Sequence, residues 1–212
     1  MNDKVITLLE NMIKDYPALA VCREDILAVF TITRDAFKSG GKLLLCGNGG
    51  SAADCEHISS ELMKGFLMQR PLDSLSQKAL SAQGDAGIYL ASKLQGALPC
   101  ISLVNPIALN TAFANDIDSK LIFAQQVMGL GTKHDVIWGV STSGNAENVQ
   151  YAIVAAKSKG IKAVGLTGKY GGELFQLCDI CIRVPEERTY KVQEYHLPIY
   201  HALCAMFEVE FY

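Results

Sequence analysis

The sequence CGNGGSAADC, from Cys46 to Cys55, follows an apolar run at 43–45 and leads into AADCEHISSELM, which has helical spacing. This order predicts a strand, a tight glycine turn and the start of a helix. Glycines let the backbone bend sharply and come close to a ligand. The helix start adds free N–H groups and the positive end of a helix dipole. The stretch therefore predicts an anion site, most often one for a phosphate group.

Short apolar runs alternate with helical stretches along the rest of the chain. The runs lie at 42–46, 100–104, 135–140, 162–167 and 179–184, and the main helical stretches at 51–66, 106–128 and 145–159, with a break expected in the second. This alternation favours an α/β fold whose parallel sheet is covered by helices on both faces. We predict a single domain, with N-terminal helices in 1–39, an α/β core in 40–190 and a C-terminal helix in 191–212.

Two segments remain open at this level. The stretch 71–96 predicts either one helix or two helices around Gly84-Asp85. Pro198 lies inside the final helical segment, where a proline removes one backbone hydrogen bond and clashes with the preceding turn. We therefore expect a kink at Pro198 or a new helix that starts there.

Composition excludes several classes of protein. The net charge is −3, the hydrophobic content 50% and the charged content 19%, which is typical of a globular chain without the basic surface of a nucleic-acid binder. No apolar run approaches the roughly 20 residues that span a membrane. The N-terminal sequence MNDKVITLLENMIKDY lacks the basic start of a signal peptide. We expect a cytoplasmic protein with no nucleic-acid or membrane partner.

The seven cysteines fit reduced, buried thiols. Cys178 and Cys181 form a CxxC motif, which can serve redox chemistry or metal binding. The segment reads as a strand, however, and an odd spacing in a strand places the two side chains on opposite faces. We therefore favour a structural role for both.

A second polar loop resembles the first in its chemistry. Ser141-Thr142-Ser143-Gly144-Asn145 follows the third apolar run, and parallel sheets bind ligands at the carboxyl ends of their strands. Hydroxyl and backbone N–H groups suit a phosphate monoester without requiring a lysine. The first loop supplies the same kinds of group from Asn48, Gly49, Gly50 and Ser51. The alternative is that both loops are ordinary turns with Ser and Asn caps.

The glycines of the first loop also permit another interpretation. Gly47, Gly49 and Ala52 fit the G-x-G-x-x-G/A pattern of dinucleotide-binding proteins. No clear second strand ending in an acidic residue appears about 20 residues later, where that pattern requires one. A P-loop does not fit, because the lysine after the final glycine is missing.

The predicted helix after the first loop carries His57 and Glu61, which share one helix face. Such a pair can bind a metal ion or transfer protons, or can be an exposed hydrogen-bonded pair. Near the C-terminus, Gln193, His196 and His201 lie in VQEYHLPIYHALC, where a histidine considered alone is more often structural than a ligand.

Five motifs taken together carry a resemblance to a known family. They are CGNGGS-x5-H-x3-E, Asn115-Asp116, STSGN, LTGKxGG and VQE-x6-H, in this order over nearly the whole chain. The set resembles the sugar isomerase (SIS) domain and, within it, the phosphoheptose isomerases, which interconvert sedoheptulose 7-phosphate and a heptose 7-phosphate. The resemblance implies a five-stranded, doubly wound parallel sheet between helices. It also implies a homotetramer with active sites at subunit interfaces and with the N-terminal helices used in oligomerisation.

The resemblance also implies roles for individual residues. The serines matched by Ser51, Ser141 and Ser143 hold the sugar phosphate, with Thr142 and Asn48 nearby. Asp116 matches an aspartate that contacts the sugar. Glu61 and His201 match the acid/base pair of an aldose–ketose isomerisation through an enediol. In zinc-containing members, the positions matching His57, Glu61, Gln193 and His201 bind the metal.

Several positions depart from the family pattern. Ala146 replaces a serine at the end of the STSGN loop, and Tyr190 replaces an acidic residue before VQE. Gly65 stands where an arginine is common, with Lys64 and Arg70 as candidate substitutes. These changes weaken the prediction of a heptose more than that of a phosphosugar.

Two other function classes remain as alternatives. Non-catalytic relatives, such as the replication-initiator-associating proteins, share the fold but lack the catalytic glutamate and histidine. This chain keeps Glu61 and His201, which favours an enzyme. A dinucleotide-binding oxidoreductase is the third possibility.

Overall fold

The computed structural model describes residues 2–212, and its centre is a parallel sheet. The strands are β1 (Leu43–Gly47), β2 (Cys100–Ser102), β3 (Val136–Ser141), β4 (Lys162–Thr167) and β5 (Ile180–Arg183). They pair in parallel in the order β2-β1-β3-β4-β5. The prediction of a five-stranded parallel sheet flanked by helices is confirmed.

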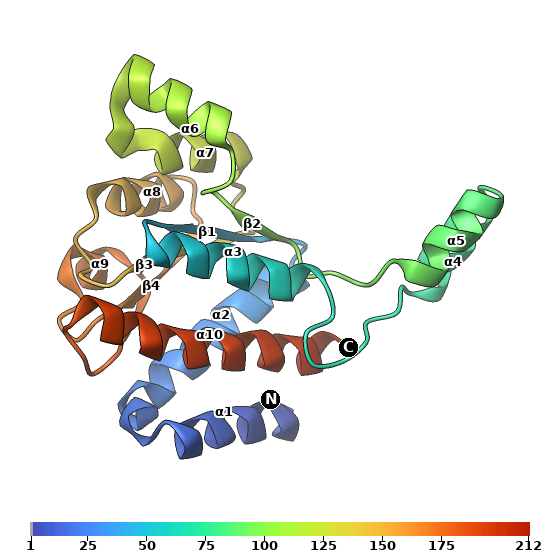
Figure 1. The fold of residues 1–212 in the computed structure, drawn as a ribbon, viewed down its shortest axis with the longest axis horizontal. Helices are drawn as coiled ribbons and strands as arrows, with labels where there is room; N and C mark the ends of the chain where they lie inside the picture. The colour runs from blue at the N-terminus through green and yellow to red at the C-terminus, as the bar shows by residue number, and fades with distance from the viewer. Residues whose placement is uncertain (1) are drawn as a thin grey trace.

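Helices cover both faces of this sheet (Figure 1). The α-helices of residues 2–212 are α1 (Asp3–Asp15), α2 (Arg23–Lys38), α3 (Gly50–Met63), α4 (Ser74–Ser81), α5 (Asp85–Lys93), α6 (Ile107–Phe113), α7 (Ile122–Leu130), α8 (Glu147–Ser158), α9 (Gly172–Leu177) and α10 (Thr189–Phe211), of which α4 and α5 lie away from the sheet. The expected break within 106–128 is present, because a π-helical turn at Ala114–Asp118 and a 3₁₀ turn at Ser119–Leu121 separate α6 from α7.

The two faces of the sheet bury separate apolar clusters, because successive strand residues point to opposite sides. Leu43 and Leu45 of β1 join the cluster beneath α2, α3 and α10. Leu44 and Cys46 join the cluster beneath α7 and α8. Burial on both sides explains why β1 is continuously apolar rather than alternating.

The apolar face of α1 is used inside the chain. Val5, Leu9 and Met12 are buried in the same cluster as α10, on which α1 packs. The amphipathic N-terminus therefore has an intramolecular partner, and its expected role in oligomerisation stays a prediction.

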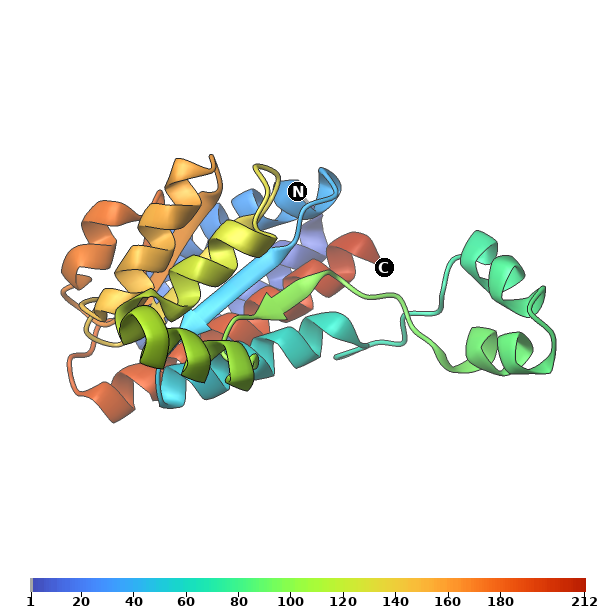
Figure 2. The same ribbon diagram turned by 90° about the horizontal axis from the view of Figure 1, so that it is seen from above.

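The ambiguous stretch before β2 forms two short helices, α4 and α5. Asp73 caps α4 by accepting from the N–H groups of Leu75 and Ser76, and Gly84 takes a positive φ of 78° at the turn. Figures 1 and 2 show this hairpin projecting from the body of the protein. We refer to residues 74–93 as the arm.

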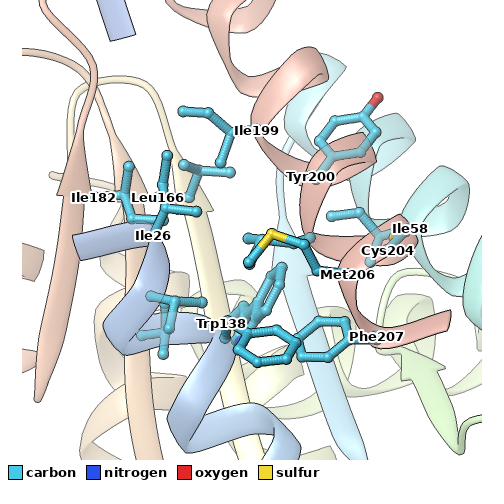
Figure 3. Packing of buried hydrophobic residues seen from close by; sticks show 14 of the residues in the cluster. Ile26, Ile58, Trp138, Leu166, Ile182, Ile199, Tyr200, Cys204, Met206 and Phe207 are labelled. Carbon is cyan, nitrogen blue, oxygen red and sulfur yellow. The ribbon is translucent and has the colours of Figure 1, made fainter. Parts of the chain in front are cut away.

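The final helix runs through Pro198 without interruption. The alternative of a new helix starting at Pro198 is therefore wrong. Ile199, Tyr200 and Phe207 are buried against the sheet and the neighbouring helices (Figure 3). Packing on both sides of the proline offsets the missing backbone hydrogen bond, which otherwise costs about 3 kcal/mol.

The CxxC motif differs from its expected geometry. Cys178 lies before β5, so strand alternation does not apply to it. Both sulfur atoms approach Gly165 from the same side. Burial raises the pKa of Cys178 to about 12 and also raises the pKa of Cys181, so neither is an activated thiolate.

No helix within residues 2–212 is long and apolar enough to cross a membrane.

His196 is expected to make stability fall as the pH drops from about 6.5 towards 4. The side chain is fully buried, and its ring nitrogens lack hydrogen-bond partners of good geometry. Burial lowers its pKa from 6.5 to about 4, and a weak backbone contact with Thr167 opposes this only in part. The unfolded chain binds the extra proton between these pH values, so the free energy of unfolding loses about 3 kcal/mol across the window.

Urea unfolding of the wild type and His196→Gln at pH 7 and pH 4.5 measures this contribution. The variant should lose less stability on acidification than the wild type. His134→Gln changes an exposed histidine and should behave like the wild type. Equal pH dependence in His196→Gln and the wild type would contradict the prediction.

Candidate functional site

A polar pocket lies where the direction of the chain crossovers reverses. β1 and β3 are neighbours in the sheet, but α3 and α8, which follow them, pack on opposite faces. Such a switch point leaves a crevice at the carboxyl ends of the two strands. A cavity of about 360 Å³ occupies it, lined by Asn48, Gly49, Gly50, Ser51, Val140, Ser141, Thr142, Ser143, Ala146, Thr189 and Gln193. The two polar loops singled out from the sequence therefore line one pocket.

A positive φ at Gly49 and close packing at Gly47 and Gly50 require the glycines of the first loop. Gly49 has a φ of 55° and precedes the first turn of α3. A Cβ at Gly47 would overlap the backbone of Ser51, and one at Gly50 would overlap the amide of Gln193. Because Gly50 has no Cβ, the side chain of Gln193 on α10 has room to reach the pocket.

The second loop is held by its own backbone. The N–H of Gly144 donates to the carbonyl of Ser141 at 3.0 Å, and Gly144 has a φ of 70°. Ser143 Oγ accepts from the N–H of Asn145 at 3.1 Å. The side chains of Ser51 and Ser141 are buried at the pocket wall, with 3% and 6% of each residue exposed. The pocket is thus lined by hydroxyl groups on loops whose backbone is held in place by its own hydrogen bonds.

Asn148 is a member of this region that sequence reasoning missed. Its amide and that of Asn48 exchange two hydrogen bonds, of 2.8 and 2.9 Å. The pair ties the first loop to the start of α8. In the sequence, only the position of Asn148 in the first helical turn after the STSGN loop indicates that it could reach the pocket region.

A cluster of acid–base groups lies further along α3 and α10. His57 Nε2 is 3.3 Å from Glu61 Oε1 and 3.4 Å from His201 Nε2. The Lys64 ammonium is 3.1 Å from Glu61 Oε2. The expected pairing of His57 and Glu61 on one helix face is present, and the fold brings His201 to it from the other helix.

The electrostatics of the cluster keep His201 neutral. Burial and the neighbouring His57 lower the pKa of His201, and Glu61 opposes this in part. At neutral pH the imidazole of His201 therefore has one protonated and one free nitrogen, which suits it to give or take a proton.

Two residues that sequence reasoning missed stand behind His57. Tyr200 Oη lies 3.1 Å from His57 Nδ1 and donates to Asp54 Oδ1 at 3.2 Å. Burial raises the pKa of Asp54, while Tyr200 and His57 oppose the shift. The signal for Asp54 was its place three residues before His57 on the same helix face; the contact of Tyr200 needs the packing of α10 on α3.

The cluster lies further along α3 than the pocket. Six residues separate Ser51 from His57 on α3, which corresponds to about 9 Å along the helix axis. His57, Glu61 and His201 are not among the residues that line the pocket.

Two expected contributors lie elsewhere. Asp116 is exposed in the π-helical turn, accepts from its neighbour Asn115, and does not line the pocket. Arg70 is fully buried against Glu208. Its suggested role as a substitute for the missing arginine is therefore wrong, because its guanidinium faces the protein interior.

Within residues 2–212, no group of three or more His, Cys, Asp and Glu side chains is arranged to hold a metal ion. Of the four residues expected to bind a metal, Glu61 forms an ion pair with Lys64, and Gln193 lines the pocket.

Comparison with known proteins agrees with this geometry. The sequence matches the SIS domain over residues 103–209, and a second SIS domain description over residues 11–96. It is 35% identical to the phosphoheptose isomerase of Aneurinibacillus thermoaerophilus, over 98% of this chain and 94% of that protein. The chain belongs to the SIS domain family, among its phosphoheptose isomerases.

Further phosphoheptose isomerases are similar to this chain over most of its length. The protein from a Nitratiruptor species is 39% identical over 89% of this chain and 88% of its own length. The solved structure from Francisella tularensis has a TM-score of 0.76 at 30% identity, and the one from Neisseria gonorrhoeae 0.74 at 27%. Each covers 98% of both chains. The chain, arm included, is therefore similar to phosphoheptose isomerases over nearly its whole length.

Proposed function

We propose that this chain is a phosphosugar isomerase that interconverts a ketose phosphate and an aldose phosphate, with sedoheptulose 7-phosphate as the first candidate substrate. The observation that carries the proposal is the contact of Glu61, His57 and His201 about 9 Å along α3 from a pocket lined by serines. Residues 1–212 would act as one domain. The substrate follows from the phosphoheptose isomerases that the chain resembles along its length.

The pocket at the switch point suits the phosphate. Ser51, Ser141 and Ser143, with Thr142, offer hydroxyl donors, and Asn48, Gly49 and Gly50 stand at the N-terminus of α3. A helix N-terminus favours an anion through its free N–H groups and its dipole. Ala146 lines the same pocket without a hydroxyl, so the phosphate would be held by the remaining groups.

The cluster suits the proton transfers of an enediol mechanism. Glu61 would remove a proton from the carbon beside the carbonyl of the ketose and return it to the former carbonyl carbon. His201, which is neutral, would give a proton to the carbonyl oxygen and take one from the neighbouring hydroxyl. Both roles need groups at the same end of the sugar. The contacts of Glu61 and His201 with the same imidazole, that of His57, support this because they bring the two side chains close together.

The donor atoms of the cluster also suit zinc. Zinc binds His nitrogen and carboxylate oxygen at about 2.0–2.2 Å in tetrahedral sites, which places neighbouring donors about 3.3–3.4 Å apart. His57 Nε2 has these separations from Glu61 Oε1 and from His201 Nε2, but the three side chains are not yet arranged around one metal position, and Lys64 holds the other oxygen of Glu61. His57, Glu61 and His201, with Gln193, would hold the ion once Glu61 leaves Lys64. When bound, zinc would polarise the carbonyl of the substrate.

The test is turnover of a panel of substrates. The purified protein is incubated with sedoheptulose 7-phosphate and with other ketose and aldose phosphates, with and without zinc, and its metal content is measured. Isomerisation of at least one of them supports the proposal. Tight binding of sugar phosphates without turnover would instead favour the non-catalytic alternative, and tight binding of NADH alone would favour an oxidoreductase.

We also propose that the chain forms a homotetramer in the cytoplasm. All seven cysteines are free thiols, which suits a reducing compartment. The arm leaves large apolar side chains exposed, including Leu75 at 78% and Tyr89 at 63%. Helices as short as α4 and α5 are marginal by themselves, so a second copy that covers them would stabilise both partners.

Light scattering of the wild type should give the mass of a tetramer. Replacing Leu75 and Tyr89 by Asp should produce smaller species, because charges on the arm would oppose burial. Tyr170→Ser changes an exposed aromatic residue on another surface and should leave the mass unchanged. A monomeric wild type would refute the tetramer, and an unchanged mass in the double variant would refute the role of the arm.

A further inference from the structure

We propose that Tyr200 is a positioning residue that selects the tautomer of His57 by linking it to Asp54. The inference rests on the proposed function for its consequence, since His57 matters there as a ligand or proton partner. The link itself stands on the contacts of three side chains, two from α3 and one from α10.

The geometry of the link is a short chain of hydrogen bonds. Tyr200 Oη lies 3.1 Å from His57 Nδ1 and 3.2 Å from Asp54 Oδ1. The ring of Tyr200 is held in the core, with 1% of the residue exposed (Figure 3). Because the ring is packed on all sides, the hydroxyl cannot turn away to solvent.

Proton counting sets the direction of the chain. A tyrosine hydroxyl has one proton to donate, and a carboxylate only accepts. With that proton directed to Asp54, the hydroxyl oxygen of Tyr200 is left as an acceptor for His57. The partner nitrogen, Nδ1, must therefore carry a proton.

The consequence appears on the other side of the imidazole. A neutral ring with its proton on Nδ1 has a free lone pair on Nε2. That atom faces Glu61 Oε1 and His201 Nε2, at 3.3 and 3.4 Å. The lone pair is thus directed into the cluster, where it can accept a proton from His201 or bind a metal ion. A hydrogen-bonded partner on the far nitrogen is the usual means of orienting a ligating histidine.

The other neutral tautomer of His57, with its proton on Nε2, is favoured by Glu61. A proton on Nε2 of His57 would satisfy Glu61 directly, and without Tyr200 nothing in the cluster disfavours that state. It would occupy the nitrogen that the site needs free. The hydroxyl of Tyr200 therefore favours the tautomer of His57 with its proton on Nδ1 over the tautomer with its proton on Nε2.

The direct test is the tautomer of His57 in the metal-free, full-length protein. Protein labelled with ¹⁵N-histidine is examined by long-range ¹H–¹⁵N correlation, which distinguishes the two ring nitrogens, and the His57 signal is identified by its loss in His57→Gln. We expect the proton on Nδ1 in the wild type and a shift towards Nε2 in Tyr200→Phe. A proton on Nε2 in the wild type, or an unchanged tautomer in Tyr200→Phe, would overturn the proposal.

A second measurement uses zinc alone as the probe. Tyr200→Phe should bind zinc about 10–100-fold more weakly than the wild type, as is typical when a partner of a ligating histidine is removed. Tyr195→Phe removes a hydroxyl from the same helix that is not among the hydrogen-bond partners of His57, and should bind zinc like the wild type. In an isomerase assay, kcat should fall in Tyr200→Phe with KM nearly unchanged.

The two proposals fail in different ways. A wild type that neither turns over phosphosugars nor binds zinc contradicts the proposed function, while the NMR result still decides the role of Tyr200. An active wild type whose Tyr200→Phe variant keeps the tautomer, the zinc affinity and kcat contradicts the role of Tyr200 alone.

Discussion

Glu61→Gln is expected to lower kcat for isomerisation by about 10²–10⁴-fold, the usual contribution of general acid–base catalysis. Glutamine has nearly the same shape and keeps a hydrogen-bonding oxygen beside His57, but it cannot take a proton from carbon. Binding of the sugar phosphate should change little, because the serine-lined pocket lies about 9 Å away along α3.

Because Glu61 is also a proposed zinc ligand, kcat alone does not separate the two roles. Incorporation of deuterium from D₂O at the carbon beside the carbonyl reports the proton transfer directly, and the metal content of the variant reports binding. Glu56→Gln changes an exposed carboxylate on the same helix and should leave both unchanged. Normal turnover in Glu61→Gln would refute the assignment of the base.

Arg70→Met is expected to lower the free energy of unfolding by about 3–5 kcal/mol, because it leaves a buried carboxylate without its partner. Arg70 Nε lies 2.7 Å from Glu208 Oε1, and both side chains are fully buried. The guanidinium also donates to the carbonyl groups of Leu62 and Glu61 at the end of α3. The pair thus joins α3, the loop before the arm and α10.

The pH dependence of this pair has a definite sign. Burial alone would raise the pKa of Glu208, but the backbone N–H groups of Phe66 and Leu67 and the Arg70 guanidinium together hold it below its ordinary value. A carboxyl whose pKa is lowered by folding contributes stability above its unfolded pKa, and that contribution is lost as the pH falls.

Urea unfolding at pH 7 measures the effect. Lys38→Met removes a partner from the more exposed Lys38–Glu210 pair and should cost no more than about 1 kcal/mol. Replacing both Arg70 and Glu208 by apolar residues should recover part of the loss, because no buried charge remains. A loss below that of Lys38→Met would contradict the prediction.

The sheet was predictable because its central strands are buried on both faces. Runs such as 43–46 and 163–166 are continuously apolar or small, and glycine-rich or polar turns follow them. The same logic failed at Cys178, because a strand boundary shifted by two residues removes the alternation on which the argument depends. The arm was undecided because its side chains do not enter the core, so no burial pattern marks its boundaries.

The site was predictable in its parts rather than in its contacts. His57 and Glu61 are neighbours by helix periodicity alone. Asn148 and Tyr200 were missed because their partners lie 100 and more residues away in sequence. Arg70 was misassigned for a similar reason, since its partner Glu208 is on the last helix.

The sequence from Cys46 to Cys55, with its later counterpart at 141–145, determined by itself that two glycine- and serine-rich loops each end a strand of a parallel sheet and start a helix. Local spacing suffices for this, because strand, turn and helix periods are properties of adjacent residues. Only the tertiary structure decided that α10 passes unbroken through Pro198, brings His201 to His57, and places Tyr200 against Asp54. Those contacts depend on how two helices distant in sequence pack on one face of the sheet, which no local pattern encodes.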